Sequence, residues 1–307
     1  KDRTRKKKLL MYKAQTTEKN TSKKNDGSRS DGGTVTSAGA KVKNEGRPEK
    51  MAEVGWSKKT GTNQYMKKKK YVEVGDGIEH ALALRADGSL TGSGLNFEGE
   101  LDFPVAGTGY AAVAAAEYYS VALRRDGTVI AAGDNSYGQT NVPPGLSGVV
   151  AIAAYRQTLA LKNDGTVLAW GLNDFGQTNV PNGLSNVVAI AAGAYASIAL
   201  KSDGTLVPWG TVTMPNGLSN ITAVAAGQRG HFLVLKSDST VVGWGENSVG
   251  EATPPSGLSN VVGIAAGNAH SLARESEGTG VGWGAGPHGP PLPYAPSSPA
   301  KIPTTAW

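Results

Sequence analysis

The chain repeats itself about every 38 residues, and this repeat limits what the chain can fold into more than any other feature. The unit is clearest at residues 187–210, VVAIAAGAYASIALKSDGTLVPWG, and it returns at 110–133 and 260–284. The Trp position of the final Trp-Gly pair marks six copies, at Ser93, Ala132, Trp170, Trp209, Trp244 and Trp283. A weaker copy ends at Trp56, and successive markers are 37, 39, 38, 39, 35 and 39 residues apart. This period indicates small supersecondary units that bury their apolar faces against one another.

Each unit predicts short β-strands. Apolar runs such as 187–192 and 198–201 are of strand length. Between two such runs lies an Asp-Gly pair, with the aspartates at Asp87, Asp126, Asp164 and Asp203. We expect each pair to form a tight two-residue turn, because both residues accept positive φ values. A Val-Pro or Met-Pro pair follows later in the repeat and suits an outer strand. About four short strands per repeat, seven times over, predict an all-β chain folded as a seven-bladed β-propeller.

The pattern V-x-I-A-A-G-x-x-x-S-L-A-L-K-x-D-G-T-V-x-x-W-G resembles the repeats of the RCC1-like propellers, named after the eukaryotic regulator of chromosome condensation. The GQTNVP loop at 176–181 is most similar in style to secreted bacterial members, such as the seven-bladed β-lactamase inhibitor protein of Streptomyces. The resemblance covers residues 72–284 well and 33–71 poorly. It implies a protein-binding propeller with a degenerate first blade and a secreted or extracellular location. A nuclear or nucleoid-associated location is the alternative.

Charge and composition divide the chain into three parts. Residues 1–32 lack apolar periodicity and form a basic arm, and residues 33–284 form the propeller, with the degenerate blade at 33–71. Residues 285–307 hold seven of the 16 prolines and predict an extended tail that closes the ring. The first 70 residues carry 21 Lys and Arg against 7 Asp and Glu, a net charge of +14 within a total of +6. The arm and the body therefore need separate functional interpretations.

The basic segment suggests a polyanion partner, either nucleic acid or an anionic surface, since clustered lysines neutralise phosphates. The candidate lysines are Lys6, Lys7, Lys8, Lys23, Lys24, Lys67, Lys68, Lys69 and Lys70. Two alternatives are a solubilising tail and a structural subunit of an extracellular or surface assembly. No stretch of 18 apolar residues exists, so we expect no membrane span.

The sequence offers little for catalysis. With no cysteine, a thiolate nucleophile and a thiolate metal site are excluded. The G-x-S-x-G, H-E-x-x-H and Walker A motifs are absent. His80 and His270 occupy one repeat position, which favours a packing role within the blade. We therefore expect a chain that is not an enzyme, with no cofactor and no metal.

The residues that vary within the repeat are the candidates for recognition. They follow the Ala-Ala-Gly marker, where loops of successive blades share one face, and Tyr and Arg dominate protein-binding hot spots. The candidate partner-binding residues are Tyr118, Tyr119, Tyr155, Arg156, Tyr195, Arg229 and His231. The resemblance implies that the tyrosines touch a bound protein, while the alternative is that they only cover the rim. A second set after the Trp-Gly pair is expected to anchor its loops, at Phe97, Tyr137, Phe175 and Val249.

Overall fold

A computed structural model describes residues 71–103, 109–285 and, as backbone, 300–302. These residues belong to one compact unit, Asn44–Trp307. Their regular structure consists of nineteen β-strands in six antiparallel sheets. Within this part of the chain, no helix has the length and apolar character needed to cross a membrane. The all-β prediction is confirmed.

The sheets follow one another along the chain. The first contains β1 (Tyr71–Asp76), β2 (His80–Arg85) and β3 (Leu90–Gly94), and the second β4 (Tyr110–Ala115), β5 (Tyr119–Arg124) and β6 (Val129–Gly133). The third contains β7 (Val149–Ala154), β8 (Gln157–Lys162) and β9 (Val167–Gly171), and the fourth β10 (Val187–Ala192), β11 (Ala196–Lys201) and β12 (Leu206–Gly210). The fifth contains β13 (Ile221–Ala226), β14 (His231–Lys236) and β15 (Val241–Gly245). The sixth contains β16 (Val261–Ala266), β17 (His270–Glu275), β18 (Gly280–Gly284) and β19 (Ala300–Ile302).

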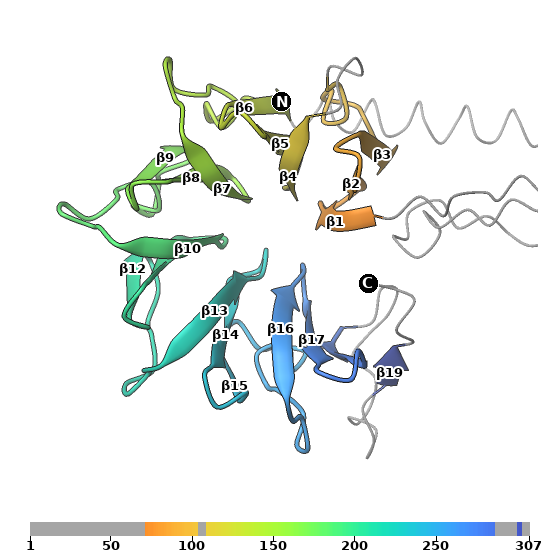
Figure 1. The fold of residues 1–307 in the computed structure, drawn as a ribbon, viewed down its shortest axis with the longest axis vertical. Helices are drawn as coiled ribbons and strands as arrows, with labels where there is room; N and C mark the ends of the chain where they lie inside the picture. The colour runs from red at the N-terminus through yellow and green to blue at the C-terminus, as the bar shows by residue number, and fades with distance from the viewer. Residues whose placement is uncertain (1–70, 104–108, 286–299, 303–307) are drawn as a thin grey trace, which may run out of the picture. The chain divides into compact units, whose positions relative to one another are not determined.

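The six sheets stand around a common centre with the first strand of each innermost (Figure 1). Each of these first strands pairs with the second strand through a register shift near its start, as between Val187 and Ala189 in β10. Such a bulge increases the local twist of the strand.

The number of strands per sheet differs from the sequence prediction. The first five sheets have three strands, and only the sixth has four, because β19 pairs with the outer edge of β18. The expected fourth strand is missing where the Val-Pro pairs lie. The valines of these segments, Val142 and Val180, pack on the apolar clusters between sheets instead of extending along an outer edge. The seventh copy, which ends at Trp56, lies outside the described residues.

The core lies between neighbouring sheets, and the second strand of each sheet contributes most to it. Five of the six residues are buried in β2, β5, β8, β11 and β14. Strands covered on both faces are expected to be apolar along their length rather than alternating. Between the fourth and fifth sheets, for example, Ile198 and Leu200 pack with Phe232, Val234 and Trp244.

The Asp-Gly hairpins use a different turn from the one that the sequence predicts. In the β8–β9 hairpin, Lys162 N–H donates to the carbonyl of Thr166 at 2.9 Å and Gly165 N–H donates to that of Lys162 at 3.0 Å. Gly165 has a φ of 77°, but Asp164 is not among the residues with positive φ. This is a three-residue loop in which glycine alone adopts the left-handed conformation. The two-residue prediction is wrong.

The aspartate of each hairpin stabilises its turn. Asp164 Oδ1 accepts hydrogen bonds from the backbone N–H of Thr166 at 3.0 Å and from its hydroxyl at 2.6 Å. These bonds and the ion pair with Lys162 hold the pKa of Asp164 well below its usual range. Turn chemistry therefore accounts for the recurring aspartates.

The β14–β15 hairpin offers a stability test, because Ser239 has a φ of 66° where other hairpins have glycine. We expect Ser239→Gly to raise the free energy of unfolding by about 0.5–1 kcal/mol, since glycine adopts this conformation without steric cost. Gly204, with a φ of 78°, is the matched site, and Gly204→Ser is expected to lower stability by a similar amount. Urea unfolding of both variants measures the effect. A loss of stability in Ser239→Gly contradicts the argument.

Candidate functional site

Two sets of loops lie together at one end of the sheets, and we call this end the loop face. The first set joins the first and second strands of each sheet, at 77–79, 116–118, 155–156, 193–195, 227–230 and 267–269. The second set follows each third strand. Backbone hydrogen bonds join the two sets, as from Leu172 N–H to the carbonyl of Arg156 at 3.1 Å and from Thr211 N–H to that of Tyr195 at 2.8 Å. The sequence prediction that these variable loops share one face fits this arrangement.

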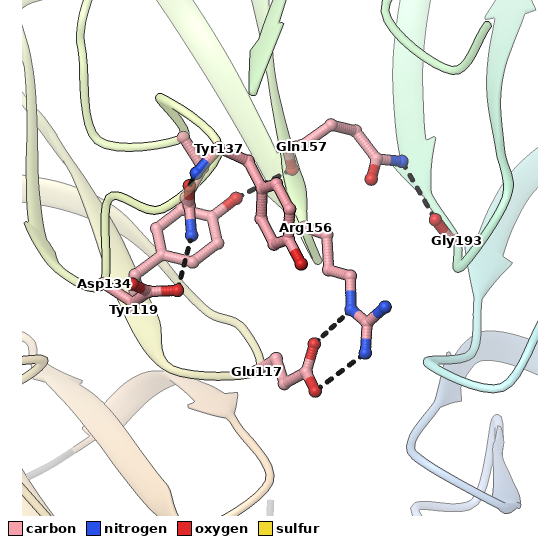
Figure 2. Close-up of polar contacts among 8 residues, drawn as sticks. Glu117, Tyr119, Asp134, Tyr137, Arg156, Gln157 and Gly193 are labelled. Carbon is pink, nitrogen blue, oxygen red and sulfur yellow. Dashed lines mark hydrogen bonds and ion pairs between the residues drawn. The ribbon is translucent and has the colours of Figure 1, made fainter. Parts of the chain in front are cut away.

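Arg156 and Glu117 form an ion pair between the third and second sheets (Figure 2). Arg156 Nε and Nη2 donate to the two carboxylate oxygens of Glu117, the second bond at 3.0 Å. This pairing raises the pKa of the guanidinium. The guanidinium carbon also lies 5.7 Å from the centre of the Tyr155 ring, within cation–π range. A bidentate pair of this kind fixes the arginine in one orientation.

Tyr155 lies largely beneath this ion pair. Only 8% of the residue is exposed, and burial raises the pKa of its hydroxyl, with a further contribution from the negative charge of Glu117. Tyr155 therefore supports Arg156 more than it reaches a partner.

Tyr195 is the most exposed of the candidate tyrosines, at 47%. Its ring packs edge-on against Phe175 of the preceding loop, with ring centres 4.8 Å apart. Tyr137 and Phe175 occupy equivalent loop positions and are 50% and 45% exposed, while Phe97 lies one position earlier in its loop and is 38% exposed. That these residues anchor their loops stays a prediction, since the rings are partly exposed and that of Phe175 contacts Tyr195 on the loop face. They extend the aromatic surface of the loop face.

Tyr119 and His231 do not belong to this surface. Tyr119 is 1% exposed, and its hydroxyl donates to the carbonyl of Gln157 at 2.8 Å (Figure 2). His231 is fully buried, with Nε2 3.1 Å from Ser271 Oγ. Each is the first residue of a second strand, where the side chain points between two sheets. Their assignment to partner binding is wrong.

In four of the six sheets, the side chain at this first position of the second strand makes a hydrogen bond to the next sheet. His80 Nε2 lies 2.7 Å from Ser120 Oγ, and Gln157 Nε2 donates to the carbonyl of Gly193 at 2.9 Å. His80 and His231 thus have a structural role, but the bond reaches the neighbouring sheet and not their own.

The remaining candidates differ in setting. Tyr118 is half-buried, and Arg229 is exposed with no ion-pair partner among residues 71–103 and 109–285. Beside Arg229, Gln228 Nε2 donates to the carbonyl of Asp76 at 3.0 Å and so joins the fifth sheet to the first. Burial raises the pKa of the Asp76 carboxyl, and the nearby His270 opposes this effect.

The lysine candidates lie in residues 1–70, outside the described part, so polyanion binding stays a prediction.

Six repeated antiparallel sheets around one centre, bonded from each sheet to the next, define a β-propeller. Residues 110–139, 149–177 and 221–251 match the model of the Regulator of chromosome condensation (RCC1) repeat. The chain therefore carries RCC1-type repeats, which confirms the resemblance seen in its sequence. The particular likeness to secreted bacterial members stays a prediction.

Solved structures with the same fold come from several sources. Prp20p from Saccharomyces cerevisiae, which was studied for its binding to Gsp1p and histones, matches with a TM-score of 0.59 and 21% identity over 70% of this chain and 72% of that one. Human WBSCR16 matches with a TM-score of 0.59 and 21% identity, over 70% and 76% of the two chains. The ectodomain of the Physcomitrella patens receptor kinase CR4 matches with a TM-score of 0.60 and 18% identity, over 70% of this chain and 64% of that one. Likeness at this identity shows the fold alone. No curated protein matches the sequence.

Proposed function

We propose that this chain is a non-enzymatic binding protein that presents its loop face to a protein partner. The observation that carries the proposal is the group of exposed aromatic rings, centred on Tyr195 and Phe175, on a framework whose second strands are buried. Large rings held by a rigid scaffold bury much area at little cost in conformational entropy. Prp20p, with the same fold, supports the proposal because its binding to Gsp1p and histones has been studied.

The charges of the loop face indicate the chemistry of the partner. Glu117 neutralises Arg156 and holds it against Tyr155, so a partner meets this arginine as part of an aromatic surface. Arg229 is an exposed cation of the face, while Asp174 and Glu246 are exposed carboxylates of the same set of loops. A partner patch that is mainly apolar, with polar groups of both signs at its edge, complements this arrangement.

The test is capture of a partner by a variant that lacks the exposed rings. Tyr195→Ala combined with Phe175→Ala is expected to weaken capture from source material by at least about tenfold, because central aromatic residues dominate binding energy. The captured protein is identified by mass spectrometry, and its affinity for each variant is then measured.

The matched control removes exposed apolar side chains elsewhere. Val150 and Val188 are 53% and 55% exposed and lie at the start of β7 and β10, away from the loop face. Val150→Ala combined with Val188→Ala is expected to leave capture unchanged. If both double variants bind equally well, the proposed surface is wrong.

A further inference from the structure

The loop between β12 and β13 is five residues shorter than its counterparts. Thr211 and Leu172 make equivalent backbone bonds, to the carbonyls of Tyr195 and Arg156 respectively. After Leu172 the chain reads NDFGQ-TNVP, whereas after Thr211 it reads VTMP directly. The segment that corresponds to residues 173–177 is therefore missing between the fourth and fifth sheets. We call this segment the Gly-Gln turn. Its full-length counterparts are 135–139 and, with Glu in place of Gln, 96–100 and 247–251.

Elsewhere the Gly-Gln turn fills the outer end of the interface between two sheets. Its last residue is buried: Gln139 is 3% exposed, and Gln177 and Glu251 are fully buried. In the three turns that precede a sheet with the repeated tryptophan, the carbonyl of this residue accepts two bonds from that sheet, one from a hydroxyl and one from the tryptophan. The carbonyl of Gln139 accepts from Thr158 Oγ1 at 3.0 Å and from Trp170 Nε1 at 3.0 Å. The carbonyl of Gln177 accepts from Ser197 Oγ at 2.9 Å and from Trp209 Nε1 at 2.8 Å. The carbonyl of Glu251 accepts from Ser271 Oγ at 2.7 Å and from Trp283 Nε1 at 2.9 Å.

The interface that lacks the turn also lacks this acceptor. Trp244 Nε1 is buried and has no hydrogen-bond partner in the described part of the chain. Phe232 stands where four of the other five sheets have Ser or Thr and the first has Ala81, and it stacks on Trp244 with ring centres 5.5 Å apart. Because phenylalanine has no hydroxyl, only one of the two usual donors remains at this interface, and this donor, the indole N–H of Trp244, has no acceptor in the described part of the chain. A buried donor without an acceptor is energetically costly.

Phe232 does not fill the space completely. A cavity of about 300 Å³ remains, lined by Tyr195, Ala196, Thr211, Val212, Thr213, Gly230, Phe232 and Gly245. Tyr195 and Gly230 belong to the loop face, so the cavity lies beside the exposed aromatic rings. Its volume is at the lower end of the range for ligand sites and suits a few residues of a peptide.

We propose that this cavity binds a turn of a partner protein that resembles the missing Gly-Gln turn, with an apolar or aromatic residue followed by glycine and a carboxamide residue. Trp244 Nε1 is buried and does not line the cavity, so the Phe232 ring stacked on this tryptophan must move aside before the turn's main-chain carbonyl can accept its hydrogen bond. The side chains of the turn pack against Tyr195. The chain's own architecture supports this choice of ligand, because such a turn occupies the same place at the four other interfaces between successive described sheets. The inference rests on the proposed function and deepens it, since it gives the loop face an anchoring cavity.

The direct test uses the full chain and the peptide NDFGQTN, which has the sequence of residues 173–179. With ¹⁵N-labelled tryptophan, the chain gives one indole signal for each of its six tryptophans, and Trp244→Phe assigns the relevant one. We expect the peptide to shift the Trp244 indole proton downfield in a saturable way, as a new hydrogen bond requires. A scrambled peptide, GNQTFDN, is expected to leave it in place. An unshifted Trp244 signal with NDFGQTN overturns the inference.

A second test restores the turn within the chain. Insertion of Asn-Asp-Phe-Gly-Gln between Thr211 and Val212 is expected to move the Trp244 indole signal downfield without peptide and to weaken peptide binding by at least about tenfold. An insertion of Gly-Ser-Gly-Ser-Gly at the same place is the control of equal length, and it leaves the Trp244 signal where the parent chain has it. A restored variant that keeps the parent signal and binds the peptide fully contradicts the inference.

The restored variant also separates this inference from the proposed function. If it captures the partner fully while Tyr195→Ala with Phe175→Ala does not, the cavity is not the anchoring point and the binding face stands. If both variants lose capture, both proposals are supported. Full capture by both variants overturns both.

Discussion

Replacing Tyr119 with alanine is expected to lower the free energy of unfolding by about 3–5 kcal/mol, the usual cost of removing a buried aromatic ring. The ring is 1% exposed and belongs to the apolar cluster between the second and third sheets, with Val121, Leu123 and Ala160. The hydroxyl adds a bond to the carbonyl of Gln157 in the next sheet. Urea unfolding followed by circular dichroism measures the loss.

Two further variants separate the contribution of the buried ring to stability from that of its hydroxyl and from the loss of an exposed ring. Tyr119→Phe keeps the ring and loses only the hydroxyl, so we expect a cost of about 0.5–1.5 kcal/mol from the lost hydrogen bond, since the Gln157 carbonyl still accepts the N–H of Tyr155 at 3.0 Å. Tyr137 is 50% exposed, and Tyr137→Ala is expected to cost less than about 0.5 kcal/mol. Equal losses in Tyr119→Ala and Tyr137→Ala contradict the buried position of Tyr119.

Acid is expected to destabilise the propeller through two buried histidines at sheet interfaces. Burial lowers the pKa of His80 from 6.5 to about 4, and it also lowers that of His231, although Glu251 opposes the effect. The unfolded chain therefore binds protons more readily than the folded one below pH 6.5. Stability is complete above this pH, falls as the pH drops, and levels off below about 4. For His80 the loss amounts to up to about 3 kcal/mol.

Urea unfolding at pH 7, 5 and 4 measures this dependence, and glutamine is the matched replacement. Gln157 occupies the same position in the third sheet and lies 3.4 Å from the hydroxyl of Ser197, so His80→Gln can keep a bond to Ser120 without taking up a proton. We expect His80→Gln combined with His231→Gln to flatten the pH dependence between 6.5 and 4. An unchanged pH dependence assigns the acid sensitivity to other groups.

The period of the repeat was sufficient to predict the fold class, because only stacked β-units satisfy a 38-residue spacing of short apolar runs and turns. The number of strands per sheet was not predictable in the same way. Whether a Val-Pro segment pairs as a strand or packs as a loop depends on its neighbour, as the packing of Val142 on the adjacent cluster shows.

The candidate site was predictable to the level of the loop but not of the residue. Tyr118 and Tyr119 are adjacent, yet the strand begins between them, so one side chain lies at the surface and the other between sheets. A recurring position also does not reveal its exposure. Phe175 recurs in phase like Trp170, but Trp170 donates to a buried carbonyl and Phe175 projects from its loop.

The shortened loop between β12 and β13 suggests how such a chain could diversify during evolution. Loss of five codons, together with an aromatic residue at position 232, alters one interface without touching the hydrogen-bonded ladders on either side. Gene duplication supplies many equivalent junctions, and each can be opened or closed independently by small insertions and deletions. New specificities can thus arise through changes in length at one junction, while selection maintains the shared framework.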